Sequence, residues 1–383
     1  MEPMTQIVQT DGYLRIKEVS LNFVRAMKIG TAPGVYCKEV GEGESLYGSY
    51  HAAHILDLFG ELDNISERDR DQWADIFRKK QTGTGFFTNR AGFENTILNP
   101  EELDPFWHST RGNLWALRIL DRAPHRPLDF IEPLMDAKAL YRWVKSYDWK
   151  NSWAAGNQIL ACATALLAQR DWFGADDVDH VMEHGMYPAL EELIDEHTGF
   201  WGTQYGSDLP SGLFGTIHVT PIYFRQKWPL RAVERNVDST LKCQLSDGSF
   251  WPGGSDCPDF DGAYMMANLA ELTDYRREDL QHAARRYLEH ALMHESPDAC
   301  GWLLHRRDSR PEDWVPRPHF LWKPGRQLVT ELRDDDPART HIMLGSWFYP
   351  LSIALIAHML GDTGYEGPYR MNAMSLHQSN VFE

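Results

Sequence analysis

The sequence lacks the features that mark several large classes of protein. Its five cysteines are odd in number, widely scattered and include no CxxC pair, which argues against a disulfide framework or a zinc knuckle and favours a reducing compartment. No run of about 18 apolar residues occurs, and the first residues show no basic segment followed by an apolar one. We therefore expect a soluble, cytoplasmic protein without a transmembrane segment.

Basic residues are also scarce. The 38 lysines and arginines stand against 55 aspartates and glutamates, which gives a formal net charge of -17. No strongly basic stripe offsets this charge, so broad binding to nucleic acid or to anionic membranes is excluded. No proline-rich or Gly/Ser-rich linker divides the chain, and we expect one domain over residues 1–383.

Apolar helical segments alternate with charged, amphipathic ones along the chain. The periodicity predicts apolar or small-residue helices at 45–61, 108–121, 151–169, 213–225, 260–272 and 341–360. It predicts amphipathic helices at 13–28, 66–80, 132–147, 177–196, 230–244 and 277–293. This repeated pairing of an inner with an outer helix predicts an all-α fold, an (α/α)6 toroid.

Turns that combine glycine with an aromatic residue follow three of the predicted outer helices, at 81–87, 195–202 and 244–251. Glycine supplies the left-handed backbone that ends a helix, and the aromatic ring can fill the gap between neighbouring helix pairs. The regular pattern breaks at 294–340, a long segment rich in Pro, Trp and Arg. A loop of this length inside a compact domain is usually functional or disordered, and we interpret it as a lid or substrate-binding loop.

The segment 258–263 (Pro-Asp-Phe-Asp-Gly-Ala) follows the third turn and opens an apolar run. The turns resemble the QW-type repeats of the terpenoid cyclase and protein prenyltransferase superfamily, whose fold is an α/α barrel. The segment itself resembles the Asp-x-Asp-Asp motif of class II, squalene-hopene-type cyclases, although Gly262 stands where that family has its last Asp. The resemblance implies acid-initiated cyclisation or isomerisation of an isoprenoid alkene, with Asp261 as proton donor and Asp259 as supporting carboxylate.

The same segment can be compared with the prenyltransferase subunit that binds zinc through an Asp, a Cys and a later His. Asp261 and His341 fall at matching places, but Ala263 occupies the position of the cysteine, and loss of a thiolate ligand costs much of the affinity for zinc. His51 and His54 share a helix face but lack a third ligand in a recognisable motif. We therefore predict neither a metal nor another cofactor.

If the inner helices run parallel, their N-terminal ends share one rim, where polar and aromatic residues converge. We predict His341 as the partner of the acid Asp261. The predicted substrate-binding residues are Tyr50, His51, His108, Arg111, Asn157, His218, Trp251, Tyr264, Trp347 and Tyr349. On this hypothesis the partner is a small molecule of isoprenoid type, and either the 294–340 segment or a second copy of the chain in a homodimer excludes water.

Two other functions fit the same residues. The (α/α)6 barrel also hosts glycoside hydrolases and polysaccharide lyases, in which sugars stack on Trp while His, Tyr, Arg and paired carboxylates perform acid–base work; the chain has 14 tryptophans. The third hypothesis is a toroid that binds a partner without catalysis, for which we expect an ordinary, low pKa at Asp261. Fold alone does not decide between these functions.

Overall fold

The computed structural model describes residues 9–39, 41–88, 106–310, 315, 318–323, 327–332, 343–361 and 363–370. The inner helices are α2 (Leu46–Leu58), α4 (Trp107–Ile119), α6 (Ser152–Phe173), α9 (Leu209–Arg225), α11 (Asp256–Leu272) and α13 (Met343–Leu360). The outer helices are α1 (Asp11–Met27), α3 (Glu67–Arg78), α5 (Ala137–Lys145), α7 (Val178–Val181) continued by a π-helix (Met182–Met186) and α8 (Tyr187–Glu191), α10 (Val233–Cys243) and α12 (Arg277–Leu292). Short 3-10 segments span Glu61–Asn64, Asp129–Leu134, Trp149–Asn151 and Thr203–Tyr205. Strands β1 (Pro318–Lys323) and β2 (Gln327–Leu332) form an antiparallel hairpin.

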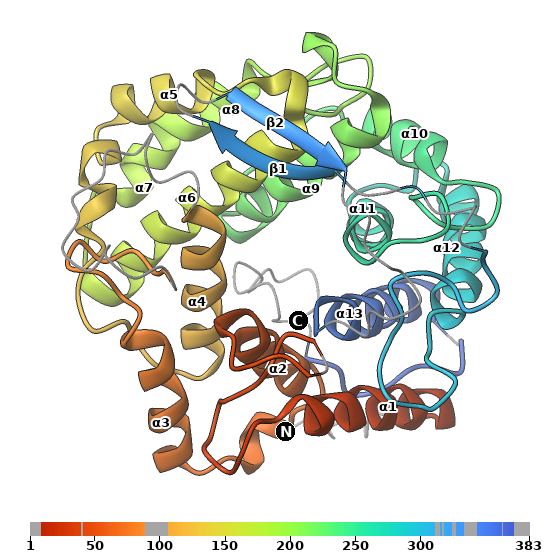
Figure 1. Ribbon diagram of the computed structural model, residues 1–383. Coiled ribbons are helices and arrows are strands. Elements are labelled where there is room, and N and C mark those ends of the chain that lie inside the picture. The colour runs from red at the N-terminus through yellow and green to blue at the C-terminus, as the bar shows by residue number, and fades with distance from the viewer. Residues whose placement is uncertain are drawn as a thin grey trace, which may run out of the picture.

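The inner helices form a closed ring. Each packs against the next along the chain, from α2 through α4, α6, α9 and α11 to α13, and α13 packs against α2. The amphipathic helices lie around this ring (Figure 1). Because the inner helices contact neighbours on several sides, they need no polar face, and this is why their sequence is apolar or small all round. The arrangement confirms the predicted (α/α)6 toroid.

Neighbouring inner helices run in the same direction. Tyr47 and His108 occupy the second positions of α2 and α4, and their rings are stacked with centroids 6.3 Å apart. Phe260 and Phe348, from the second turns of α11 and α13, stack at 4.4 Å. The first turns of these helices therefore share one face of the ring, as the sequence predicted for the site.

Within the described residues, α13 is long and apolar enough to cross a membrane by length and composition. However, 72% of this 18-residue window is buried inside the protein, where α13 packs against α1, α2, α11 and α12. Its apolar character thus fits a core position in the ring.

Each turn that combines glycine with an aromatic residue is held by a side chain of the inner helix that follows it. The backbone N–H of the aromatic residue donates to a hydroxyl or carboxylate: Phe87 to Thr110 (3.0 Å), Trp201 to Thr216 (3.2 Å), Phe250 to Asp259 (2.7 Å) and Trp302 to Ser346 (3.3 Å). The aromatic rings are buried, as predicted. The turn at Trp302 lies inside the predicted loop and was missed by the sequence analysis, although its Gly-Trp pair was visible. Asp259 thus takes a place that a Thr or Ser fills in the other turns.

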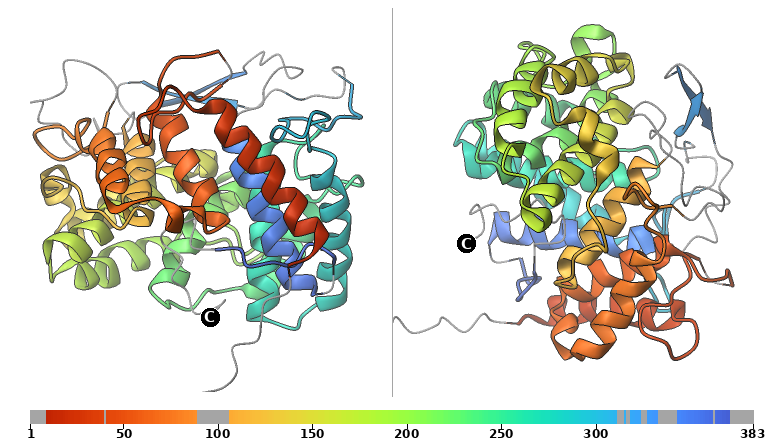
Figure 2. Two further views of the ribbon diagram at one scale, coloured as in Figure 1. Left: turned by 90° about the horizontal axis from the view of Figure 1, so that it is seen from below. Right: turned by 90° about the vertical axis from the view of Figure 1, so that its left-hand side faces the viewer.

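The 294–340 segment also contains the hairpin of β1 and β2 rather than loop alone. Figure 2 shows the hairpin standing over one face of the ring. The indole N–H of Trp251, in the turn before α11, donates to the carbonyl of Val315 at 2.7 Å. The chain therefore enters the hairpin on the face where α11 begins. A role of this segment as a lid stays a prediction.

Gly262 has a packing role that explains why no aspartate stands there. A Cβ at this position would lie 2.2 Å from the ring of Phe250, the aromatic residue of the preceding turn. We expect Gly262→Ala to lower the free energy of unfolding by about 1–3 kcal/mol through overpacking, measured by chemical denaturation. Gly345→Ala on α13 is the control, because its Cβ would meet no atom closer than 3.5 Å. An equal loss in both variants would contradict this explanation and indicate helix propensity or a general effect.

Candidate active site

Arg111 lies in the interior of the ring, on the second turn of α4, with 8% of its surface exposed. Its Nη1 donates to Asn157 Oδ1 on α6 at 2.6 Å, and its guanidinium lies over the ring of Trp115, 4.9 Å from the centroid. Electrostatic interactions also join it to Tyr50 on α2 and to Asp261 on α11. The guanidinium of Arg111 thus interacts with residues of α2, α6 and α11 near the starts of the inner helices, where the sequence predicted the site.

No carboxylate among the described residues is bound to this guanidinium. Within the described part of the chain, Arg111 forms no ion pair and makes only the hydrogen bond to Asn157, although an arginine carries five N–H donors. Desolvation lowers its pKa to about 10, and an uncompensated buried charge costs several kcal/mol. The arrangement favours an anion with two oxygens, a carboxylate or a phosphate, because such a group meets the guanidinium in a bidentate manner.

Histidines surround Arg111 and are neutral near pH 7. Desolvation, with the charge of Arg111 adding to it, lowers the pKa of His108 and of His218 to about 3. His51, whose Nδ1 bonds to the carbonyl of Tyr47 at 2.9 Å, has a pKa well below its usual value, mainly because it is desolvated. His108 is exposed and His218 is half-buried, so both face solvent within a largely protein-lined space. In the empty site these imidazoles are weak bases, and an anion bound to Arg111 would raise their pKa by offsetting its charge.

Asp261 is the carboxylic acid of this site. It is 3% exposed, and its Oδ2 has no hydrogen-bond partner in the part of the chain that the structure describes. Desolvation, and after it the negative charge of Asp256, raises its pKa well above the usual value, while Arg111 acts in the opposite direction. A carboxyl group held neutral by an apolar environment can donate a proton near neutral pH. This result does not match the ordinary pKa expected of a toroid without catalysis.

Aromatic rings line the same level of the ring. Trp153 on α6 packs against Phe214 on α9 with centroids 4.8 Å apart, and Trp251 lies 6.1 Å from Phe214. On the other side, Trp347 stacks on His54 at 4.4 Å with an angle of 14° between the planes. Flat rings of this kind bind the apolar faces of ligands.

The structure brings together most of the predicted site residues. Those around Arg111 are Tyr50, His51, His108, Asn157, His218 and Asp261; Trp251 and Trp347 belong to the aromatic surfaces. Tyr264 is buried against Phe224 and Phe260. Asp259 and Tyr349 instead lie in a buried polar network with residues of α12. His341 lies outside the described residues, so its predicted partnership with Asp261 stays a prediction.

Several residues of this region were missed by the sequence analysis. Cys257, one turn before Asp261 on α11, is half-buried and interacts electrostatically with Arg111, and its spacing of four from Asp261 was the available signal. Trp115 stands four residues after Arg111, the spacing at which side chains meet on a helix. The sequence could not show that Arg111 lacks a carboxylate partner among the described residues, because this depends on which side chains the other inner helices place opposite to it.

No protein-family model matches the chain, and no curated protein matches its sequence. Among solved structures, a family 88 glycosyl hydrolase from Bacteroides vulgatus aligns with a TM-score of 0.51 at 10% identity, covering 91% of this chain and 99% of that one. An α-1,6-mannanase variant from Salegentibacter sp. HEL1_6, in complex with α-1,6-mannotetrose, aligns at 0.48 and 11% identity, covering 91% and 99%. An unsaturated glucuronyl hydrolase mutant from Streptococcus agalactiae, complexed with a sugar, aligns at 0.45 and 11% identity, covering 93% of each chain. At these identities the likeness concerns the fold.

The interpretation as a terpenoid cyclase with an isoprenoid substrate is wrong. The solved structure that shares this fold with the chain at a TM-score of 0.51 is a glycosyl hydrolase and not a terpenoid cyclase. The helix alternation and the glycine turns belong to the (α/α)6 architecture itself, so they could not distinguish the families. The remaining signal was the Asp-x-Asp pair, and there Asp259 holds the turn at Phe250, while Phe250 leaves no room for a side chain at position 262.

Proposed function

We propose that the chain is a carbohydrate-active enzyme that cleaves a glycosidic bond in a saccharide carrying a carboxylate, such as a uronic acid. The observation that carries this proposal is the buried guanidinium of Arg111, which lacks an anionic partner among the described residues and faces the neutral acid Asp261. A uronate bound to Arg111 and Asn157 would place its glycosidic bond within the same polar group of side chains.

The roles follow from the protonation states. Arg111 neutralises the carboxylate of the substrate, and the planar guanidinium orients that carboxylate through two parallel hydrogen bonds. Asp261 protonates the bridging oxygen as the bond breaks. His108 or His218, neutral and reached by solvent, is the base and removes either a proton from the sugar ring or one from water. The bound carboxylate neutralises Arg111, whose charge adds to desolvation in lowering the pKa of both histidines in the empty site, so substrate binding makes them stronger bases.

Two features of the surroundings support a sugar ligand over an apolar one. The group around Arg111 offers amide, imidazole, phenol and carboxyl groups for sugar hydroxyls, whereas an isoprenoid would leave these groups without partners. The rings of Trp153 and Trp251 supply surfaces on which a sugar ring can stack. The shared fold with a glycosyl hydrolase agrees with this proposal.

The test is turnover of a saccharide panel by the full chain. Saturated and unsaturated uronate oligosaccharides are incubated beside neutral mannan and glucan oligosaccharides of equal length, and products are identified by mass spectrometry. We expect cleavage of uronate substrates alone. A gain of water in the products identifies hydrolysis, and products without that gain identify elimination. Turnover confined to the neutral sugars, or none with any substrate, would overturn the proposal.

A further inference from the structure

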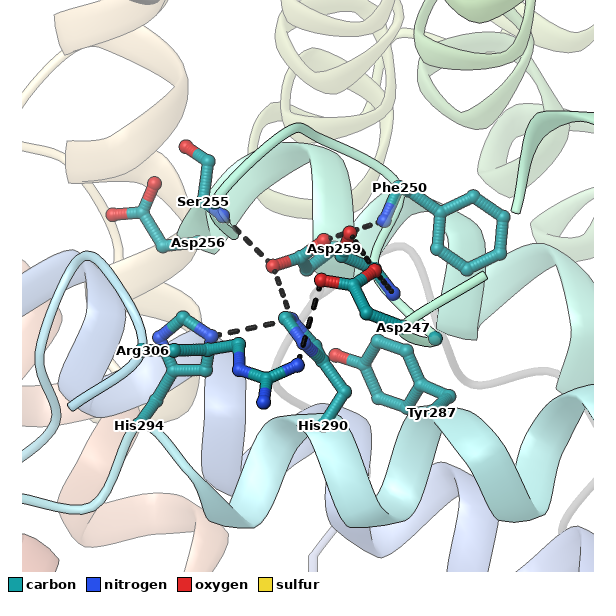
Figure 3. A network of polar contacts seen from close by, with 12 residues as sticks. Asp247, Phe250, Ser255, Asp256, Asp259, Tyr287, His290, His294 and Arg306 are labelled. Atoms are coloured by element: carbon teal, nitrogen blue, oxygen red, sulfur yellow. Dashed lines mark hydrogen bonds and ion pairs between the residues drawn. The ribbon is translucent and has the colours of Figure 1, made fainter. Parts of the chain in front are cut away.

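A second polar cluster lies where α11, α12 and α13 meet. Figure 3 shows Asp259 facing His290 and His294, which stand four residues apart on and just after α12. Asp259 Oδ2 is 2.9 Å from His290 Nε2, and His290 Nε2 is 3.2 Å from His294 Nε2. The candidate ligand atoms of these three residues all lie within 4.8 Å of one another.

A fourth polar atom closes the cluster. The hydroxyl oxygen of Tyr349 lies 3.2 Å from Asp259 Oδ2 and 3.3 Å from His294 Nε2. In a tetrahedral zinc site with bonds of about 2.0–2.1 Å, neighbouring ligand atoms are about 3.3 Å apart. Four of the six separations among these atoms, from 2.9 to 3.3 Å, are close to this spacing, and the ligand atoms of Asp259 and His294 lie within 4.8 Å of each other.

Surrounding hydrogen bonds orient His294 and Asp259, whereas Nδ1 of His290 has no hydrogen-bond partner among the described residues. His294 Nδ1 bonds to the carbonyl of Leu303 at 3.0 Å; because a carbonyl only accepts, Nδ1 carries the proton and Nε2 presents its lone pair to the cluster in the neutral ring. This pattern is typical of a histidine that binds a metal. Asp259 Oδ1 accepts from the N–H of Phe250 at 2.7 Å and Oδ2 accepts from the N–H of Ser255 at 2.8 Å, and these two bonds fix the carboxylate with Oδ2 near His290.

The cluster contains more polar groups than are needed to hold the turn at Phe250. A single hydroxyl of Thr110, Thr216 or Ser346 holds the equivalent turn elsewhere in the ring. Here a carboxylate does so and adds two histidines, all of them at most 1% exposed. Gly254 makes room for them, since a Cβ there would lie 2.5 Å from His294 Cε1.

We propose that Asp259, His290 and His294 bind a structural divalent transition metal, with zinc as the expected ion and Tyr349 as the fourth neighbour. The set of one carboxylate and two imidazoles suits zinc. The site is closed, because the described side chains surround it and leave it inaccessible to solvent, as in structural zinc sites. The ion would join α11, which carries Asp261, to α12 and α13. The competing account is a hydrogen-bond network without metal, in which His290 Nε2 donates to Asp259.

The experiment measures metal binding by the full chain. The protein is treated with a chelator and then titrated with Zn²⁺, and with Co²⁺ as a spectroscopic probe, while thermal unfolding is followed. We expect about one metal ion per chain, a cobalt spectrum with the intense visible bands of four-coordination, and a rise in Tm on binding. The double variant H290Q/H294Q should lose all three effects.

A matched control separates this site from adventitious binding at the surface. His180 and His184 are also four residues apart, with ring centroids 4.3 Å from each other, but both are exposed. The variant H180Q/H184Q should retain stoichiometric binding. Binding lost in that variant instead, or no uptake of zinc or cobalt by the unaltered chain, would overturn the proposal in favour of the hydrogen-bond network.

A further variant keeps the test decisive if H290Q/H294Q does not fold. Tyr349→Phe removes one hydroxyl and retains the ring, and it should weaken metal binding about 10- to 100-fold, the usual effect of losing a supporting partner. An unchanged affinity in a folded Tyr349→Phe protein, combined with the failure of the double variant, would count against the site. None of these readouts depends on the proposed activity toward saccharides.

Discussion

Asp261→Asn is expected to lower kcat/KM toward the uronate substrate by about 100- to 10,000-fold, the contribution usual for a general acid. The amide has nearly the same shape but cannot donate a proton to a leaving oxygen at neutral pH. The loss should appear in kcat, since Arg111 and the aromatic surfaces still bind the substrate. Initial rates over a range of substrate concentrations separate the two parameters.

The pH dependence gives a second measure of the same group. The pKa of Asp261 is raised above its usual value, so its protonated, active form disappears as pH rises through that raised pKa, and kcat should fall on the alkaline side. The free energy of unfolding should also fall as pH rises through this range. The contribution of the neutral carboxyl group is complete below the unfolded pKa of about 3.9 and is lost as pH rises toward the folded one.

Asp261→Asn removes this titration. Relative to the unaltered chain, the variant should therefore gain stability above about pH 4, by up to about 1.4 kcal/mol for each pH unit until the folded pKa is reached. Denaturation at several pH values measures this difference. Asp57→Asn on α2 is the control, because Asp57 is also buried and desolvation raises its pKa to about 6. It should show a similar stability profile with activity unchanged. Full activity in Asp261→Asn would show that another group donates the proton.

The sequence predicted the architecture because the architecture depends on local patterns. A ring helix such as α6 is apolar or small throughout, whereas an outer helix such as α5 has a charged face, and this contrast is visible along a single chain. The predicted inner segments at 151–169 and 213–225 differ from α6 and α9 by only a few residues at their ends, within the usual uncertainty of helix boundaries.

The chemistry of the site could be predicted only in part, because it depends on distances across the ring. The rim residues were identified from their position near helix starts, and the structure does bring Arg111 close to Asn157. Asp259 looked catalytic in the sequence because its second interaction, with His290 on α12, cannot be seen from α11 alone. Its equivalence to Thr110 and Thr216 becomes visible only when the turns are superposed in space.

Arg111→Gln should have the largest effect on substrate binding. If Arg111 binds the carboxylate of the substrate, removing the guanidinium should cost about 2–5 kcal/mol of binding free energy. This corresponds to a fall in kcat/KM of roughly 30- to 5,000-fold, mainly through a higher KM. Arg111→Lys retains the charge but loses the planar fork, so it should recover only part of the loss. With a neutral analogue of the same saccharide as substrate, the Arg111 variants should have the same kcat/KM as the unaltered chain.

The stability of the empty protein should move in the opposite direction. Arg111 is a buried cation whose pKa is lowered by desolvation and which has no described anionic partner. Glutamine in its place removes the cost of that charge, so Arg111→Gln should raise the free energy of unfolding by about 1–3 kcal/mol. A residue that served only the fold would lose stability on the same change.

Arg118 provides the matched control for this argument. It lies on the same helix, two turns after Arg111, and its guanidinium likewise covers an indole ring, that of Trp172, at 4.7 Å. It differs by its ion pair with Asp171 at 2.8 Å. Arg118→Gln should therefore lose stability and leave KM unchanged. If Arg111→Gln behaved in the same way, with KM for the uronate unaltered, the guanidinium would be structural, and the carboxylate of the substrate would have to bind elsewhere.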